Sequence, residues 1–123
     1  GRPGPVVLAL PEDMLSSMAI VEDANKARPA EAAPPPEAME ELRDLLSKAK
    51  KPLMIVGGPT WNKQAVADAT AFSEANALPV ACAFRYQDRF DNRHENYVGD
   101  VGIAINPKLA ARIKEADLLI VAG

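Results

Sequence analysis

The chain has 123 residues, 48% of them hydrophobic, which is enough for one domain with a buried core. A formal net charge of −3 argues against nucleic-acid binding, and a single cysteine excludes an intrachain disulfide or a thiolate zinc cluster. No run approaches the roughly 18 apolar residues of a membrane span, so we expect no membrane association and a cytoplasmic location.

The first segment predicts a turn followed by a strand. Gly and Pro at positions 3–5 are turn formers, and the apolar run Val6–Leu10 follows them. Residues 16–36 differ, because their proline and charge content favours an extended path with little apolar area to bury. We therefore expect a linker there, and we expect the chain to be a piece of a larger protein.

The remainder alternates helical and strand patterns. The first predicted elements, in chain order, are a helix from Glu37 that Pro52 ends, a strand at Leu53–Val56, a turn at Gly57–Pro59 and a helix capped by Thr60. A strand at Val80–Phe84 and an irregular charged loop at Arg85–Asp100 follow. The last elements are a helix capped by Asn106, with Pro107 at its first position, and a buried strand at Leu118–Val121. This alternation is typical of a parallel sheet. The predicted fold class is α/β, a Rossmann-like parallel sheet flanked by helices and apparently truncated.

Several segments resemble, in the same order, those of thiamine diphosphate-dependent enzymes of the acetolactate synthase-like type. The segment Gly1–Asp13 is similar to the end of that family's pyrimidine-binding domain. The segments similar to the family's central domain are Lys51–Gly58, Ala77–Ala81, His94–Gly99 and Ala116–Gly123. The resemblance implies that residues 1–15 are the last strand of the pyrimidine domain, 16–36 an interdomain linker and 37–123 an incomplete central domain.

The resemblance also implies a parent enzyme, a lyase or transferase acting on 2-oxo acids with thiamine diphosphate and Mg²⁺. Its partners would be the other domains of the parent chain, in a homo-oligomer. In this family the activating glutamate lies in the pyrimidine domain and a Gly-Asp-Gly metal motif lies in the diphosphate domain. The sequence contains no Gly-Asp-Gly. We therefore expect no catalytic residue and no metal ligand here, and a structural, inactive chain that binds neither group.

The candidate nucleotide site is Gly57, Gly58 and Thr60. These residues follow a predicted strand and precede a helix, which is where α/β sheets place phosphates. A plain tight turn is the alternative, since Gly-x-Gly-x-x-Gly and a Lys-Ser/Thr pair are both missing. FAD or ADP is the ligand that the site would take. However, Pro59 removes an N–H, and the resemblance implies that Asp100 lies where a nucleotide phosphate would approach and would oppose it, so we expect neither to bind.

Other reactive residue types give weaker predictions. Cys82 lies in an apolar run and is interpreted as a small buried hydrophobe. A zinc motif at His94 fails because Val98 stands where the second histidine is needed, so we expect His94 to make local hydrogen bonds. Two other functions stay open: a stand-alone FAD- or ADP-binding Rossmann-like module, and a non-catalytic interaction domain that uses the 85–100 loop.

Overall fold

The computed structural model describes residues 4–26 and 33–123, and the chain divides into two compact units, Gly1–Pro35 and Pro36–Gly123. In the first unit the described residues form one short helix, α1 (Glu12–Ser16). The strand predicted at Val6–Leu10 is not formed, and Val6 is 91% exposed. The reason is physical: a strand needs a hydrogen-bonded neighbour, and no described residue pairs with this segment.

Much of the predicted linker lies within the described ranges. Residues 17–26 and 33–35 have no regular secondary structure and are exposed. The remaining part of that prediction, residues 27–32, lies outside the described residues.

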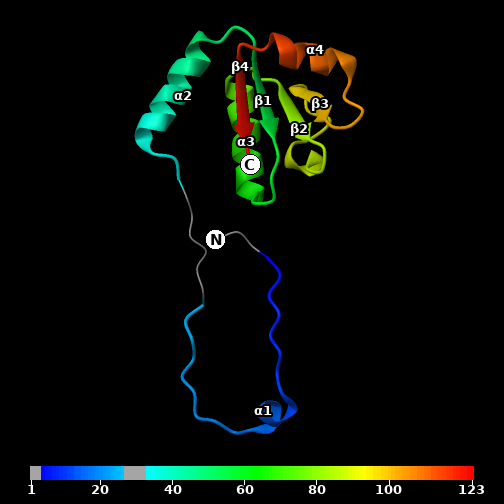
Figure 1. Cartoon of the computed structure of the whole chain (residues 1–123). Helices are drawn as coiled ribbons and strands as arrows, with labels where there is room; N and C mark the ends of the chain where they lie inside the picture. Colours follow the sequence, from blue (N-terminus) through cyan, green and yellow to red (C-terminus); the bar gives the residue numbers. More distant parts are fainter. Residues whose placement is uncertain (1–3, 27–32) are drawn as a thin grey trace. The chain divides into compact units, whose positions relative to one another are not determined.

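The second unit is built on a parallel sheet (Figure 1). Its strands are β1 (Pro52–Val56), β2 (Val80–Ala83), β3 (Tyr97–Val101) and β4 (Leu118–Ala122). The strand order is β3-β2-β1-β4, and every pairing is parallel. The central residue of β1, Met54, is in register with Val80 on one side and Ile120 on the other. This arrangement confirms the predicted α/β, Rossmann-like fold.

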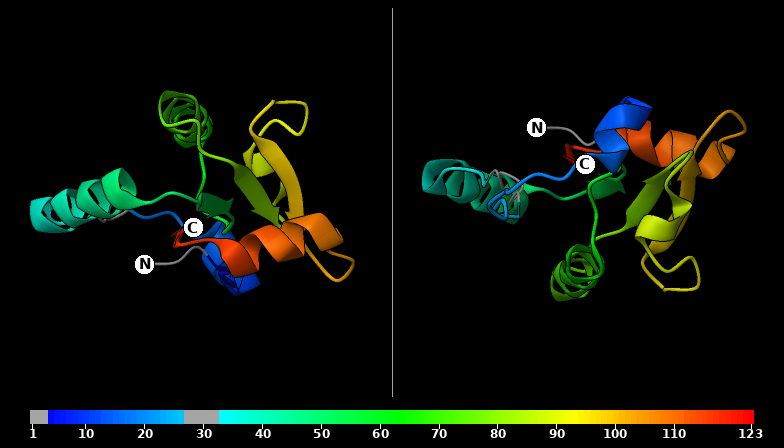
Figure 2. Two further views of the ribbon diagram at one scale, coloured as in Figure 1. Left: turned by 90° about the horizontal axis from the view of Figure 1, so that it is seen from above. Right: turned by 90° about the horizontal axis from the view of Figure 1, so that it is seen from below.

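Helices cover both faces of the sheet (Figure 2). These are α2 (Pro36–Lys48), α3 (Lys63–Ala75) and α4 (Pro107–Glu115), with a short 3-10 helix η1 (Gln87–Arg89) after β2. On one face Ala69 and Phe72 of α3, with Leu46 of α2, pack against the buried residues of β1 and β2. On the other face Leu109 of α4 packs with Leu53. Burial on both faces explains why β1 is apolar throughout.

Local signals predicted the ends of two helices correctly. The Asn106 side chain accepts a hydrogen bond from the Lys108 N–H at 2.9 Å, and Pro107 begins α4 as expected. In α2, Glu37 lies in the first turn and Lys48 in the last, which suits the helix dipole. No helix in the described ranges has both the length and the apolar character that crossing a bilayer demands.

Two predicted elements need correction. The segment Arg85–Asp100 is not one irregular loop, because it contains η1 and most of β3. That strand was missed because it lies at an edge of the sheet, is half-buried throughout, and carries Gly99 and Asp100, which disfavour strands. The last strand, β4, forms the other edge of the sheet and is not fully buried: Val121 is 73% exposed.

Candidate functional site

The predicted nucleotide turn lies at the carboxyl edge of the sheet, between β1 and β4. The Gly57 N–H donates to the Ala122 carbonyl at 2.9 Å, so the first glycine extends the strand pairing. Gly58 has φ +82°, a left-handed conformation that side chains disfavour. A Cβ atom at Gly58 would lie 2.6 Å from the carbonyl carbon of Gly123. Backbone packing therefore accounts for Gly58, whereas a Cβ atom at Gly57 would lie 2.8 Å from the Cβ atom of Ala83.

The carbonyl oxygens of the same turn are held by side chains. The indole Nε1 of Trp61 donates to the Gly57 oxygen. Arg89 Nε in η1 donates to the Gly58 oxygen at 3.3 Å. The Arg89 guanidinium also lies 5.5 Å from the centre of the Tyr86 ring and 2.7 Å from the Asp88 carboxylate. These contacts fix η1 against the turn.

The helix after the turn begins later than predicted. Its N-cap is Asn62, whose side chain accepts from the Ala65 N–H at 2.8 Å, so the capping role assigned to Thr60 is wrong. Thr60 is exposed and lies outside the helix. The reason is Trp61: its ring packs on the core and its N–H bonds back to Gly57, which keeps this stretch out of the helix.

A hollow of about 350 Å³ opens beside the start of α3. It is lined by Trp61, Asn62, Lys63, Val66, Asp88 and Arg89. A helix N-terminus and two cationic side chains favour an anion there, whereas the carboxylate of Asp88 opposes one. None of the three predicted residues lines this hollow. Sequence reasoning missed Trp61 and Arg89, although a lone tryptophan directly after a Gly-Gly turn was a usable signal.

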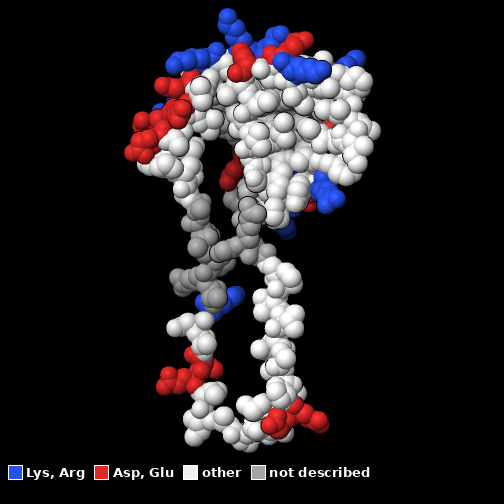
Figure 3. Space-filling model, viewed as in Figure 1, with Lys and Arg blue, Asp and Glu red and all other residues white. Residues whose placement is uncertain are grey.

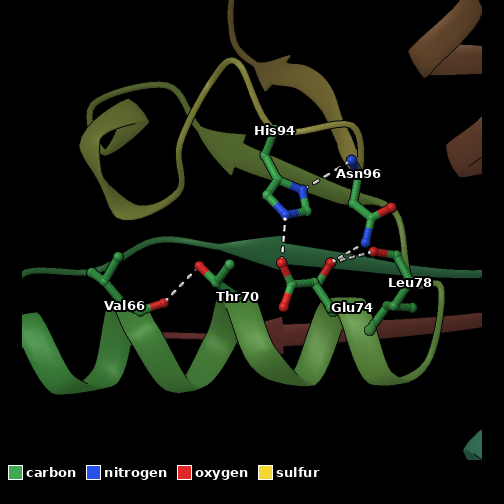
Figure 4. Close-up of polar contacts among 7 residues, drawn as sticks. Val66, Thr70, Glu74, Leu78, His94 and Asn96 are labelled. Atoms are coloured by element: carbon green, nitrogen blue, oxygen red, sulfur yellow. Dashed lines mark hydrogen bonds and ion pairs between the residues drawn. The ribbon is translucent and has the colours of Figure 1, made fainter.

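His94 takes part in a hydrogen-bonded network between the β2–β3 connection and α3 (Figure 4). Its Nδ1 accepts from the Asn96 N–H at 3.1 Å, a local bond of the kind predicted. Its Nε2 lies 3.1 Å from a carboxylate oxygen of Glu74, a partner twenty positions away that the sequence did not reveal. Asn96 in turn donates to Ser73 Oγ at 2.8 Å, and Ser73 donates to the Leu78 carbonyl.

The remaining reactive side chain is also structural. Cys82 is fully buried, as predicted, and burial raises the pKa of its thiol to about 11. The thiol is therefore protonated at neutral pH and is a poor nucleophile.

Within residues 4–26 and 33–123, no three acidic, histidine or cysteine side chains are grouped so that they could hold a metal ion. These residues do not fit Mg²⁺, and we derive no step of thiamine chemistry from them.

The amino-acid sequence of the chain is similar to those of several known enzymes. The chain is 30% identical over 123 residues to the acetolactate synthase isozyme 2 large subunit of Escherichia coli K12, with all of the chain and 22% of that protein aligned. It is 29% identical to the acetolactate synthase large subunit of Corynebacterium glutamicum, covering 100% of the chain and 20% of the relative. A sulfoacetaldehyde acetyltransferase of Rhodobacter capsulatus is 24% identical, covering 97% of the chain and 20% of the relative.

The chain thus spans about a fifth of the length of these relatives. Residues 39–123, which contain the whole parallel sheet and nearly all of α2, match the family model described as "Thiamine pyrophosphate enzyme, central domain". The chain belongs to the thiamine pyrophosphate enzyme family.

Proposed function

We propose that this chain is the central-domain part of a thiamine diphosphate-dependent enzyme that makes or breaks a carbon–carbon bond beside the carbonyl of a 2-oxo acid. The observation that carries the proposal is the 30% identity to an acetolactate synthase large subunit along the entire chain. The activity is that of a transferase. The alternative is a lyase that cleaves the same kind of carbon–carbon bond. Thiamine diphosphate and Mg²⁺ are the cofactors of the complete enzyme, and this chain binds neither by itself.

The role proposed for the chain itself is structural. Residues 1–15 belong with the pyrimidine domain, 16–36 form a linker and 37–123 form the central domain, in a cytoplasmic homo-oligomer. Two observations support this division: the compact units separate after Pro35, and the family match begins at residue 39. The partners of the central domain are then the other domains of the same enzyme.

The candidate place for a nucleotide phosphate, from FAD or ADP, is the edge that carries Gly57, Gly58 and Thr60, with the hollow beside the start of α3 as its neighbour. The Gly57 N–H is already bonded within the sheet, and Asp88 lines the hollow beside Arg89. Both features weaken phosphate binding. We therefore expect that neither nucleotide binds at this edge, and that neither raises the melting temperature of the chain more than inorganic pyrophosphate does. A larger rise that saturates with FAD or ADP would instead favour the alternative, a stand-alone nucleotide-binding module.

The decisive experiment uses the complete protein in which this chain lies. Purified with thiamine diphosphate and Mg²⁺, it is expected to convert pyruvate into acetolactate, and to lose that activity when the cofactor is removed. Sulfoacetaldehyde provides a second assay, because acetyltransferases with that substrate in their name also match the chain. Absence of any cofactor-dependent turnover of 2-oxo acids contradicts the proposal.

The isolated chain gives a complementary test. Calorimetry with thiamine diphosphate is expected to show no binding that depends on Mg²⁺, since the described residues hold no metal-binding group. Micromolar affinity that requires Mg²⁺ would show that the structural role is wrong, whatever the complete protein does.

A further inference from the structure

A second hollow lies at the opposite end of the sheet, where the strands begin. Its volume is about 480 Å³, and it lies between the α2–β1 connection, the segment before β2, and α4. Four of its lining side chains are cationic: Lys50, Lys51, Lys108 and Arg112. Figure 3 shows several Lys and Arg side chains at this end of the second unit, with Asp and Glu side chains among them. The concentration is unexpected in a chain whose net charge is −3.

Three of these four cations form no close ion pair within the described part of the chain. Lys51 Nζ pairs with Glu115 at 2.9 Å, and Glu115 is the carboxylate in the lining. The ion pairs formed by residues 4–26 and 33–123 include none from Lys50, Lys108 or Arg112. Asp117 also lies near this end: its two oxygens accept the backbone N–H groups of Lys50 and Lys51, and its charge also attracts the Lys50 ammonium. The cations with no such carboxylate partner among the described residues are Lys108 and Arg112.

The position of two cations on α4 is electrostatically unfavourable without a ligand. Lys108 and Arg112 are four residues apart, so they are neighbours on one helix face, where like charges destabilise a helix. Lys108 is also in the first turn, where the helix dipole opposes a positive charge. The same pair lines an adjoining hollow of about 300 Å³. An anion between these residues relieves both repulsions.

The larger hollow also has an apolar part to its lining, which includes Pro52, Pro79 and Ala77. Ala77 has φ +46° because it follows the C-cap of α3: its N–H donates to the Glu74 carbonyl at 3.2 Å, and the Leu78 N–H donates to the Ser73 carbonyl at 2.9 Å. Its backbone is therefore explained by the end of the helix. Cationic and apolar side chains in one lining suit a ligand with a charged group and a small apolar part.

From this geometry we propose that the hollow binds a small phosphate ester. Lys50, Lys108 and Arg112 hold the phosphate, whose oxygens match a guanidinium fork and two ammonium groups. The apolar part of the ester contacts Pro52 and Pro79. A volume of about 480 Å³ lies within the usual range for small-molecule sites. This site is separate from the turn at Gly57, which follows the other end of β1, and it does not depend on the proposed function.

The test is an NMR titration of the full 123-residue chain with inorganic pyrophosphate as the probe. We expect saturable shifts at the amides of Lys50, Lys51, Ala77 and residues 108–112. Lys108→Gln and Arg112→Gln are each expected to weaken binding at least about fivefold, and the double variant to abolish it. The matched control is Lys114→Gln, which makes the same charge change on α4 but lines neither hollow.

Three outcomes overturn the proposal. The first is that no saturable shift is seen, or that shifts are spread over basic residues across the whole surface. The second is that Lys114→Gln weakens binding as much as Arg112→Gln, because net charge alone then explains the effect. The third is that an octa-aspartate peptide binds this face more than tenfold tighter than pyrophosphate, which would assign the site to an acidic protein segment.

Discussion

The carbonyl carbon of Gly123 lies 2.6 Å from the position that a Cβ atom would occupy on Gly58. The two residues follow neighbouring parallel strands, and each has a positive φ, +82° for Gly58 and +127° for Gly123. The contact is between backbone atoms, so it cannot be relieved by rotating a side chain. The carboxyl edge of the β1–β4 pair is therefore closed by glycine packing, and a ligand is not needed to explain these residues.

The first prediction tests this packing with Gly58→Val. Steric overlap and a disfavoured φ together are expected to destabilise the second unit by about 1–3 kcal/mol. For a domain of this size that lowers the thermal midpoint by roughly 4–8 °C per kcal/mol. The control is Gly4→Ala, because a Cβ atom at Gly4 meets nothing within 4 Å. Equal midpoints for Gly58→Val and the unmutated chain would contradict the packing argument.

A second prediction concerns Asp117, whose carboxylate accepts the N–H groups of Lys50 and Lys51 at 2.8 and 2.9 Å. These bonds hold the pKa of Asp117 below its ordinary value of 3.8, the Lys50 bond contributing most. A lowered pKa means that the charged form stabilises the fold. That contribution is complete above pH 3.8 and is lost as the pH falls through the lowered pKa.

Asp117→Asn is therefore expected to lower the thermal midpoint at pH 7 and to have progressively less effect below about pH 4. Glu115→Gln is the control, since its ion pair with Lys51 is exposed on both sides and exposed pairs contribute little. Melts of both variants from pH 2 to pH 7 make the comparison. A constant difference between Asp117→Asn and the unmutated chain at every pH would show that the charge is not responsible.

The sequence predicted those elements whose signals are local. The apolar run of β1 and the Asn106–Pro107 start of α4 depend on neighbouring residues alone, and both are present. The strand at Val6–Leu10 depends on a partner elsewhere, and none of the described residues supplies one. In β3 the pairing with β2 overrides the poor strand propensity of Gly99 and Asp100.

The two candidate sites, like the strands and helices, depend partly on local sequence and partly on contacts between distant segments. The Gly57–Gly58 turn was visible as a turn, but its closeness to Gly123 depends on β4, sixty residues later in the chain, pairing with β1. The basic hollow could not be found from the sequence, because Lys50 and Arg112 are brought together only by the fold. The net charge of −3 gives no sign of the basic hollow, because most of the acidic residues that outweigh its cations lie elsewhere in the chain.

A third prediction concerns the reactivity of Cys82. At pH 8 a thiol with a pKa of about 11 has roughly 100-fold less thiolate than one with the ordinary value of 9.0, and its side chain is also fully buried. Reaction with a disulfide reagent is therefore expected to be at least about 100-fold slower in the native chain than in denaturant. Ser47→Cys in a Cys82→Ala background provides an exposed thiol for comparison. Similar native rates for both thiols would contradict the burial argument.

The last prediction concerns Ser73, the buried centre of the network that fastens the β2–β3 connection to α3. Its Oγ donates to the Leu78 carbonyl and accepts from Asn96 Nδ2, both at 2.8 Å, and the residue is fully buried. Ser73→Ala leaves both partners without this hydroxyl in a place that water does not reach. We expect a loss of about 1–3 kcal/mol in the free energy of unfolding.

Ser47→Ala is the matched control, because the Ser47 hydroxyl donates to the Asp44 carbonyl one turn earlier on an exposed helix face, where water can replace the bond. Denaturant melts of the two variants should differ clearly, with Ser47→Ala within about 0.5 kcal/mol of the unmutated chain. Amide exchange adds a second measurement: in Ser73→Ala the Asn96 amide, which bonds to His94 Nδ1, should exchange faster, since the connection is released from α3. If Ser73→Ala is as stable as Ser47→Ala and Asn96 keeps its protection, the network does not hold the connection in place.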